Sequence, residues 1–265
     1  MEPSQLDQIL WAHLLDLPYF RAMLRAVEHS FYVDIPLERP ILDLGAGDGH
    51  FASLVFEQPL EIGLDPWRAP LKEARARQAY QLLVQAEGSS MPYPDASFGS
   101  IISNSVLEHI DDIDAVLRDA QRVLKPGGRF VFCVPNQCFL SDLWGQGILQ
   151  KLGLRKLATQ YNHFFNWVAR HKHLDPPEVW TARLEKAGFE VERYWHYFPK
   201  QALHMLERGH LWGLHSLFWK KTIGRWVLIR KRWNPFIPYR KTRPFMDVGA
   251  IPEGVCTFYV ARRRA

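Results

Sequence analysis

Three glycines at alternating positions, Gly45, Gly47 and Gly49, follow an apolar run in the stretch ILDLGAGDGHF. Glycine lets the backbone adopt positive φ angles and approach a ligand closely. A helix that begins just after such a turn directs its free N–H groups and the positive end of its dipole toward the same place. The spacing therefore predicts a binding site for a nucleotide-type or carboxylate-bearing ligand.

An acidic residue, Asp65, ends the next apolar segment, twenty residues after Gly45. In nucleotide-binding α/β sheets, an acid at this place binds the ribose hydroxyls. The glycine spacing is GxGxG, whereas the dinucleotide fingerprint is GxGxxG, whose third glycine position falls here on His50. The shorter turn argues against a pyrophosphate, and so against a dehydrogenase. Taken alone, Asp65 also fits a helix N-cap before Pro66.

The segments around these residues alternate between short apolar runs and helical patterns. Such alternation is typical of βαβ units, and it predicts a mostly parallel sheet with helices on both faces. The expected strands are 40–44, 60–65, 80–88, 97–106, 129–136, 190–198 and 254–263. The expected helices are 49–57, 70–79, 111–124 and 176–189, with one or two more within 5–30. The predicted fold class is thus α/β, a Rossmann-like seven-stranded sheet.

The domain organisation follows from where the alternation of strands and helices continues and where it stops. Residues 137–175 are aromatic, basic and irregular. A basic segment lies between the last two expected strands. We expect one domain with five parts: N-terminal helices (1–39), a cofactor-binding core (40–136), an acceptor-side region (137–198), a basic Trp-rich insertion (199–250) and the last strand (251–265).

Several ordered motifs between residues 40 and 135 resemble the class I S-adenosylmethionine-dependent methyltransferases, in the methyltransferase type 11 group that includes the quinone methyltransferases. LDLGAGDG resembles the first motif of the family, and Asp65 matches its ribose-binding acid. AEGSSMPYPDASFGSI resembles the stretch that binds the adenine amine, SNSVLEHI the fourth motif, and RVLKPGGRFVFCVPN the fifth strand. The resemblance implies an enzyme (EC 2.1.1.-) that uses S-adenosyl-L-methionine and releases S-adenosyl-L-homocysteine.

The resemblance also implies a role for individual residues. The backbone of the glycine loop would face the methionine part, Asp65 would bind the ribose, and Glu87 would bind the adenine amine. The predicted cofactor-binding residues are Asp43, Gly45, Ala46, Gly47, Asp65, Pro66, Glu87, Gly88, Ser89, Ser103 and Asn104. Two positions depart from the family pattern, because Glu87 and Gly99 both stand where aspartate is usual. The longer Glu87 side chain must fold back or act through water, and the Gly99 position is structural.

Methyl transfer from a sulfonium is an in-line displacement, so the protein mainly positions the acceptor and removes a proton where the acceptor needs it. Histidine suits such a base, and His109 is the first candidate, although it also fits a residue that packs the following helix. His163, His171 and His173 are expected near the acceptor, with Tyr161 as a further proton acceptor. The histidine spacing matches no standard zinc pattern and no cysteine is nearby, so no metal is expected.

The chain carries a net charge of +5, which is unevenly distributed. Residues 200–243 contain eleven Lys or Arg and one acid, a net charge of +10. Trp212, Trp219, Trp226 and Trp233 recur there every seven residues and would share one face of a helix, although Gly213, Gly224 and Pro235 argue against one long helix. This segment fits a helical cap over the sheet, peripheral contact with an anionic membrane or, less well, a nucleic-acid surface.

The expected acceptor is a small or lipid-like molecule, and no obligate protein partner is inferred. The alternatives are an RNA methyltransferase and a cofactor-binding subunit without catalytic activity. No run approaches the roughly 18–20 apolar residues of a membrane-spanning helix, the N-terminus does not resemble a secretory signal, and the three cysteines form no CxxC pair. We therefore expect a cytoplasmic protein with reduced thiols, and peripheral membrane contact through 200–243 stays open beside the helical cap.

Overall fold

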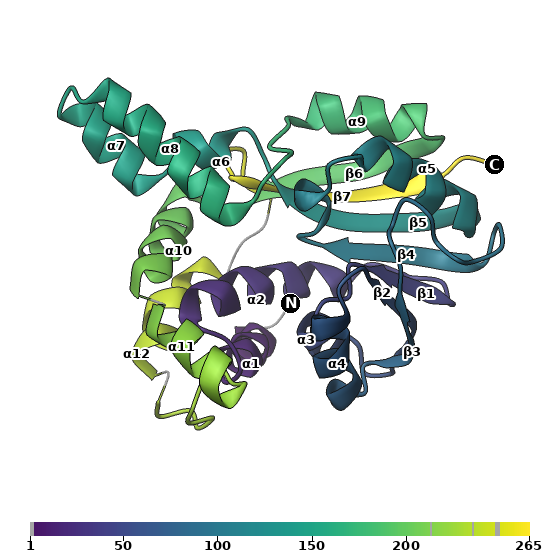
Figure 1. Ribbon diagram of the computed structural model, residues 1–265, viewed down its shortest axis with the longest axis horizontal. Coiled ribbons are helices and arrows are strands. Elements are labelled where there is room, and N and C mark those ends of the chain that lie inside the picture. The colour runs from purple at the N-terminus through teal and green to yellow at the C-terminus, as the bar shows by residue number, and fades with distance from the viewer. Residues whose placement is uncertain (1–2, 213, 235, 247–249) are drawn as a thin grey trace. The chain divides into compact units, whose positions relative to one another are not determined.

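The computed structural model describes residues 3–212, 214–234, 236–246 and 250–265, which form two compact units (Figure 1). The sheet unit comprises residues 34–137, 169–195 and 256–265. The helical unit comprises residues 1–33, 138–168 and 196–255. Both units are therefore assembled from three separate segments of the chain.

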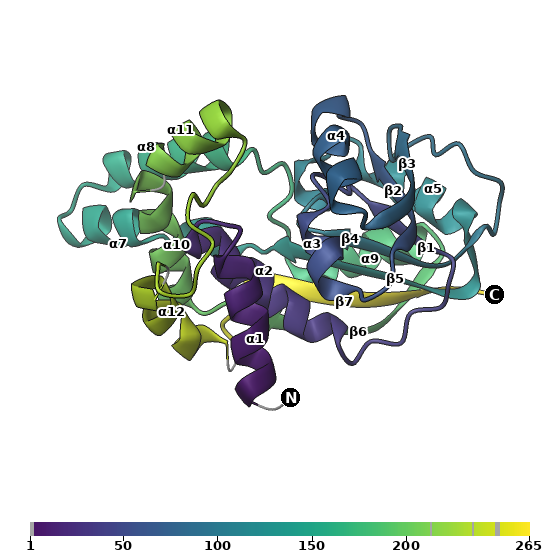
Figure 2. The ribbon, with the colours of Figure 1, turned by 90° about the horizontal axis from the view of Figure 1, so that it is seen from below.

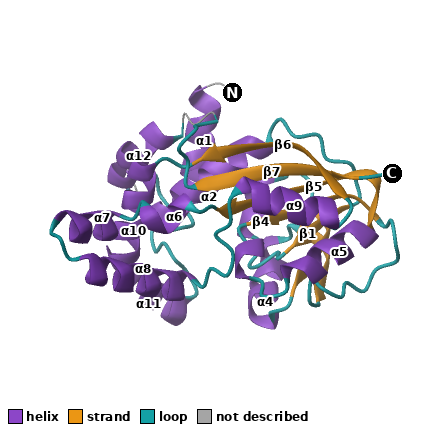
Figure 3. Cartoon of the chain, turned by 90° about the horizontal axis from the view of Figure 1, so that it is seen from above, coloured by secondary structure: helices purple, strands orange, loops and turns teal. Residues whose placement is uncertain are grey.

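The sheet unit contains the predicted seven-stranded sheet, in the order β3-β2-β1-β4-β5-β7-β6. Figure 3 shows its strands in orange. Strands β1 to β5 pair in parallel, whereas β7 is antiparallel to β5. The strands are β1 (Ile41–Leu44), β2 (Leu60–Asp65), β3 (Tyr80–Gln85), β4 (Phe98–Asn104), β5 (Leu124–Pro135), β6 (Phe189–Tyr197) and β7 (Cys256–Arg263). This arrangement confirms the predicted Rossmann-like fold, in which ligands bind at the carboxyl ends of the parallel strands.

Helices cover both faces of the sheet (Figures 1 and 2). They are α3 (His50–Val55), α4 (Arg68–Arg77), the short 3₁₀ helix η1 (Leu107–His109), α5 (Ile113–Val123) and α9 (Pro177–Lys186). Alternation along β1 sends Leu42 and Leu44 to the core under α5 and α9, where Trp180 is fully buried. Asp43 points to the opposite face, where Tyr80 binds its carboxylate.

The helical unit is built around α2 (Tyr19–Tyr32), which contacts α1 (Pro3–Leu14), α10 (Lys200–Trp212) and α12 (Phe236–Thr242). Its other helices are α6 (Cys138–Ser141), α7 (Trp144–Lys151), α8 (Arg155–Ala169, whose last residue belongs to the sheet unit), α11 (Leu214–Ile223) and η2 (Arg243–Phe245). Glu207 of α10 is buried, and its carboxylate accepts the N–H groups of Trp144 and Gly145 at 2.5 and 2.9 Å and the hydroxyl of Tyr161. The Glu207 carboxylate therefore provides acceptors for the free N–H groups at the start of α7, and it holds α8 beside α7 through Tyr161.

Two expectations about these helices were wrong. Residues 137–175 are not irregular, since α6, α7 and α8 cover most of them and bury Phe139, Ala158 and Phe165. The tryptophans of 200–243 do not share one helical face either. Gly224, at φ 75°, follows the end of α11, so Trp226 and Trp233 lie in a non-helical stretch. Gly213 and Pro235 lie outside the described residues.

A search of the described residues for a helix both long enough and apolar enough to cross a bilayer found none.

Candidate functional site

The glycine loop follows β1, and its three glycines have φ angles of 86°, 55° and 71° for Gly45, Gly47 and Gly49. A Cβ at Gly45 would come within 2.5 Å of the Val106 side chain, so this position excludes any larger residue. A Cβ at Gly47 would meet nothing closer than a backbone oxygen at 4.0 Å. The loop is therefore packed tightly at Gly45, whereas at Gly47 there is room for a ligand beside the backbone.

Asp65 connects the glycine loop to the end of β2. Its Oδ2 accepts the N–H of Gly47 at 2.9 Å, and its Oδ1 accepts the N–H of Trp67 at 2.8 Å. Burial raises the pKa of the Asp65 carboxyl, while the hydrogen bonds from Trp67 and Gly47 act in the opposite direction. Each carboxylate oxygen keeps a lone pair for a further donor. Asp65 thus both shapes the loop and remains able to accept hydroxyl groups.

Asp43 lies beneath the loop, where the hydroxyl of Tyr80 donates to its Oδ2 at 2.6 Å. Burial raises the pKa of Tyr80 far above the ordinary range, and the nearby Asp43 charge raises it further, so Tyr80 stays protonated. Gly63 makes room for this ring, because a Cβ there would come within 2.9 Å of it. The sequence prediction missed Tyr80, although an aromatic residue opening β3 beside a glycine in β2 was a signal for it.

The predicted residues at the end of β4 and after β2 and β3 lie in contrasting environments. Ser103 is fully buried, and its hydroxyl donates to the carbonyl of Leu44 at 2.8 Å. Asn104 accepts a hydrogen bond from the Cys133 thiol at 3.1 Å. Gly88 is buried close to Leu44, whereas Glu87 and Ser89 are exposed and Pro66 is partly exposed. The ends of the parallel strands therefore combine fixed, buried polar groups with an accessible acid.

His109 is the last residue of η1, and its side chain is 42% exposed. Its Nδ1 lies 3.1 Å from the carbonyl oxygen of Arg170, and its ring stacks on His171 with centroids 5.5 Å apart. His173 Nε2 lies 2.8 Å from the carbonyl oxygen of Ile110. The chain segment that carries His171 and His173 therefore packs against η1, a contact that no sequence pattern had indicated.

The other candidate side chains belong to the helical unit. His163 lies on α8 and lines a cavity of about 380 Å³ with polar neighbours that include Gln146 and Asn162. Burial and the hydrogen bond to Glu207 raise the pKa of Tyr161, which makes it a donor and a poor proton acceptor. Among the described residues, no cluster of three or more His, Cys, Asp or Glu side chains has the geometry of a metal site.

Residues 42–132 match the family described as "Methyltransferase domain". A probable S-adenosylmethionine-dependent methyltransferase of Mycolicibacterium smegmatis is 31% identical over 173 residues, which are 65% of this chain and 60% of that protein. The chain therefore spans less than two thirds of that relative. A ubiquinone/menaquinone biosynthesis C-methyltransferase UbiE of Vibrio cholerae serotype O1 is 30% identical over 185 residues, which are 62% of this chain and 70% of that protein.

Among solved structures, a SAM-dependent methyltransferase of Thermotoga maritima, described as a possible histamine N-methyltransferase, aligns with a TM-score of 0.55. The alignment covers 99% of this chain and 95% of the other, at 16% identity, and so shows a shared fold. The predicted family and the predicted methyl donor of that family are confirmed by the sequence relatives. On the match to residues 42–132 and the extended similarity to the Vibrio cholerae enzyme, the chain belongs to the class I S-adenosylmethionine-dependent methyltransferases.

Proposed function

We propose that this chain transfers a methyl group from S-adenosylmethionine to a small, lipid-like acceptor. The observation that carries the proposal is the position of Asp65, whose buried carboxylate joins the glycine loop to the end of β2 through the N–H groups of Gly47 and Trp67. An acid at this place can accept ribose hydroxyls, while the loop beside it leaves its backbone open at Gly47. When bound, S-adenosylmethionine supplies a methyl group on an already activated sulfonium.

The residues of the glycine loop fit such a cofactor. Three glycines with positive φ, at alternating positions, let the backbone come close to a molecule that lies over it, and Gly47 has no side chain in the way. Glu87, two residues after the end of β3, is exposed, so its carboxylate is accessible to an adenine amine. We assign Asp65 to the ribose, Glu87 to the adenine, with Pro66, Gly88 and Ser89 beside them, and the backbone of 45–47 to the methionine part.

Three further residues support this arrangement from below. Asp43 is bound by Tyr80, so we assign it to holding the loop in place, and it acts on the cofactor's amino group through that loop. Ser103 uses its hydroxyl on the Leu44 carbonyl and so fixes the end of β4 against β1. Asn104, beside it, is assigned to the methyl end. His109 is the proposed proton acceptor, because it is exposed at the end of η1, which follows β4 directly.

The lipid-like nature of the acceptor is supported by two observations. The Vibrio cholerae relative is named as a quinone-biosynthesis C-methyltransferase, and quinones with isoprenoid tails are apolar. The helical unit of this chain also exposes large apolar side chains, among them Phe164, Trp167 and Phe218. A soluble polar acceptor would need neither feature.

We further propose that the protein works in the cytoplasm and contacts an anionic membrane through residues 200–243.

Methyl-labelled S-adenosylmethionine, incubated with the protein and a whole-cell extract, tests this function. Label is expected in the organic phase after extraction, and Asp65→Ala should strongly reduce it at limiting cofactor concentration. Label confined to the aqueous phase would exclude a lipid-like acceptor, and label in RNA would make the protein an RNA methyltransferase. Tight cofactor binding without labelled product in any fraction would indicate a binding subunit without catalytic activity.

A further inference from the structure

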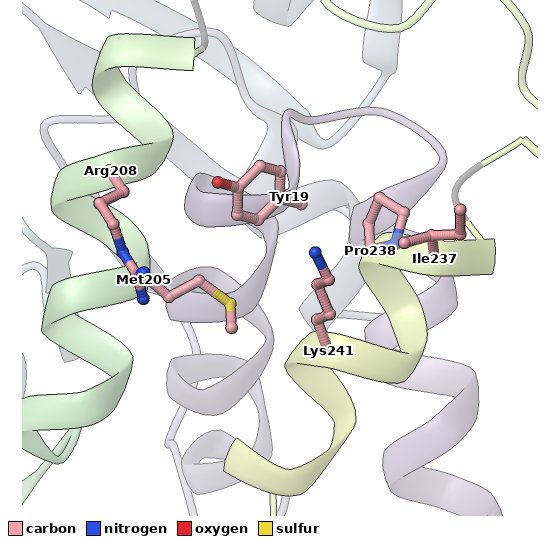
Figure 4. Close-up of a pocket in the computed structure, with 6 residues that line it drawn as sticks. All are labelled: Tyr19, Met205, Arg208, Ile237, Pro238 and Lys241. Carbon is pink, nitrogen blue, oxygen red and sulfur yellow. The ribbon is translucent and has the colours of Figure 1, made fainter.

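A cationic cavity of about 360 Å³ lies within the helical unit, between α2, α10 and α12 (Figure 4). Tyr19, Met205, Arg208, Ile237, Pro238 and Lys241 line it. Figure 4 shows the Tyr19 hydroxyl and the Lys241 ammonium directed into the space between α10 and α12, with Arg208 on the α10 side. One hydroxyl and two cations thus surround a single cavity.

Two of the residues that line this cavity, Arg208 and Lys241, are basic. Within the part of the chain that the structure describes, none of its lining residues is acidic. Three acids of the helical unit are engaged elsewhere, because Asp7 pairs with Arg243, Asp16 pairs with Arg230, and Glu207 binds the start of α7. Burial raises the pKa of Tyr19 against the opposing effect of Arg208, so the hydroxyl remains a donor. Such a set of donors fits a phosphate group.

A second cavity of about 340 Å³ shares Tyr19 and Pro238 with the first, so the two are adjacent. Its walls are largely apolar. They comprise Leu14, Leu17, Pro18, Tyr19, Phe20, Ser216, Trp219, Trp226, Val227, Leu228, Ile229, Asn234 and Pro238. A ligand that filled both cavities would carry an anionic group at one end and an apolar chain at the other.

Three of these lining residues, Leu228, Ile229 and Ile237, are exposed, and so are Phe218, Ile223 and Trp233 of the same stretch of chain. Basic residues alternate with them along the sequence, including Lys220, Lys221, Arg225, Lys231 and Arg232. Exposed apolar groups beside basic groups are typical of helices and loops that lie in the interface of an anionic bilayer. The surface and the cavities therefore point to the same kind of ligand.

From this arrangement we propose that the helical unit binds an anionic phospholipid of a bilayer. The phosphate lies on Arg208, Lys241 and the Tyr19 hydroxyl, and an acyl chain enters the apolar cavity next to them. A nucleic acid would supply phosphates but no apolar chain, so the second cavity favours the lipid. This inference deepens the membrane contact proposed for residues 200–243, and it is independent of the proposed methyl transfer, since it concerns residues outside the cofactor site.

Sedimentation with vesicles tests the headgroup part of the proposal. We expect the full chain to bind vesicles of phosphatidylcholine with 20% phosphatidylglycerol (about one lipid in five) at least tenfold more tightly than pure phosphatidylcholine. The double variant Arg208→Gln with Lys241→Gln should bind the phosphatidylglycerol vesicles at least tenfold more weakly than the wild type. Lys151→Gln with Lys156→Gln removes the same charge from exposed positions of α7 and α8 and should cost less than twofold. Equal losses of vesicle affinity in the two double variants would show that only the overall charge matters, and would overturn the proposed phosphate site.

Two soluble probes distinguish a lipid from a free phosphate. Dihexanoyl-phosphatidylglycerol should raise the melting temperature of the protein, whereas glycerol phosphate at the same concentration should not. Equal stabilisation by both probes would identify a phosphate site and overturn the lipid assignment. Phosphatidylglycerol brominated on its acyl chain should quench tryptophan fluorescence, and Trp219→Phe with Trp226→Phe should remove most of that quenching. Quenching that persists in this variant would place the chain outside the apolar cavity.

Discussion

The backbone N–H of Gly47 donates to the Oδ2 of Asp65 at 2.9 Å, which ties the loop after β1 to the residue that ends β2. The two residues are eighteen positions apart in the sequence. Through this contact, the residue proposed to bind the ribose also determines the path of the backbone proposed to bind the methionine part. A change at Asp65 should therefore affect both halves of the cofactor site together.

Asp65→Ala should weaken the binding of S-adenosylmethionine at least tenfold, because it removes the ribose acceptor and releases the N–H groups of Gly47 and Trp67. Asp65→Asn retains one oxygen acceptor and should give an intermediate loss. Titration calorimetry measures both. Glu57→Gln, an exposed acid that precedes β2, is the matched control and should bind normally. Unchanged affinity in Asp65→Ala would contradict the proposed site.

The glycine loop offers a test that separates folding from binding. Gly45→Ala should lower the free energy of unfolding by roughly 2–4 kcal/mol, since it combines a positive φ with a clash against Val106. Gly47→Ala should cost only about 1 kcal/mol, because its Cβ meets open space. Urea denaturation gives these values.

Both glycine variants should lose most of their cofactor affinity, although only Gly45→Ala should be markedly unstable. Val106→Ala, added to Gly45→Ala, should recover part of the stability and none of the binding. A Gly47→Ala protein that binds S-adenosylmethionine normally would show that the cofactor does not lie over this part of the loop.

His109 is best tested with two substitutions. If His109 accepts a proton from the acceptor, then Ala and Asn should both lower kcat by roughly 10²–10⁴-fold while cofactor binding stays unchanged. Asparagine can still donate to the Arg170 carbonyl oxygen, which lies 3.1 Å from Nδ1 in the wild type. Near-normal kcat in His109→Asn, with a loss in His109→Ala, would therefore make His109 a positioning residue. The pH dependence of kcat gives an independent readout, because only a catalytic base would contribute its own ionisation to it.

Glu192 gives a prediction about pH. Its carboxylate joins β6 to two other strands through Arg129, at 2.8 Å, and Arg262. Burial raises the pKa of Glu192, but the hydrogen bonds and charges of the two arginines outweigh it and lower the pKa below its usual value. The stabilisation is therefore complete above the unfolded-state pKa of about 4.3, and it is lost as the pH falls through the lower folded-state pKa.

Glu192→Gln should accordingly reduce stability on the order of 1 kcal/mol at pH 7, with a difference from the wild type that shrinks below about pH 4. Thermal unfolding across this pH range measures the difference. Glu190→Gln, an exposed acid in the same strand, should show no such trend. A constant difference at every pH would mean that the variant acts through packing instead of charge.

The sheet could be predicted from the sequence because its signals are local. Each strand is a short apolar run, and the turn after β1 contains glycines whose positive φ angles few other residues adopt readily. Asp65 was found for the same reason, since it is the last residue of its strand. The hydrogen bond between Tyr80 and Asp43 was not found, because these residues are thirty-seven positions apart and only the pairing of β2 with β3 brings the Tyr80 ring beside Gly63 and near Asp43.

The helical unit was predicted less well for a physical reason. Its helices α6 to α8 are stabilised by contacts with distant segments. Glu207, for example, accepts hydrogen bonds from Trp144, Gly145 and Tyr161, which precede it by 63, 62 and 46 positions. Aromatic and basic residues in this region obscured the apolar spacing. The seven-residue repeat of tryptophan suggested a shared helical face that does not exist. Such a repeat places residues on one face only within a continuous helix, and α11 ends just before Gly224.

The strand order has a consequence for biosynthesis. Because β7 lies between β5 and β6, the edge of β5 has no partner until residues 256–263 leave the ribosome. By then β6 has already been made, more than fifty residues earlier, and has no neighbour to pair with. The nascent chain therefore carries two open strand edges through the whole synthesis of the basic segment, the stage at which a holdase chaperone would protect it from pairing with other chains.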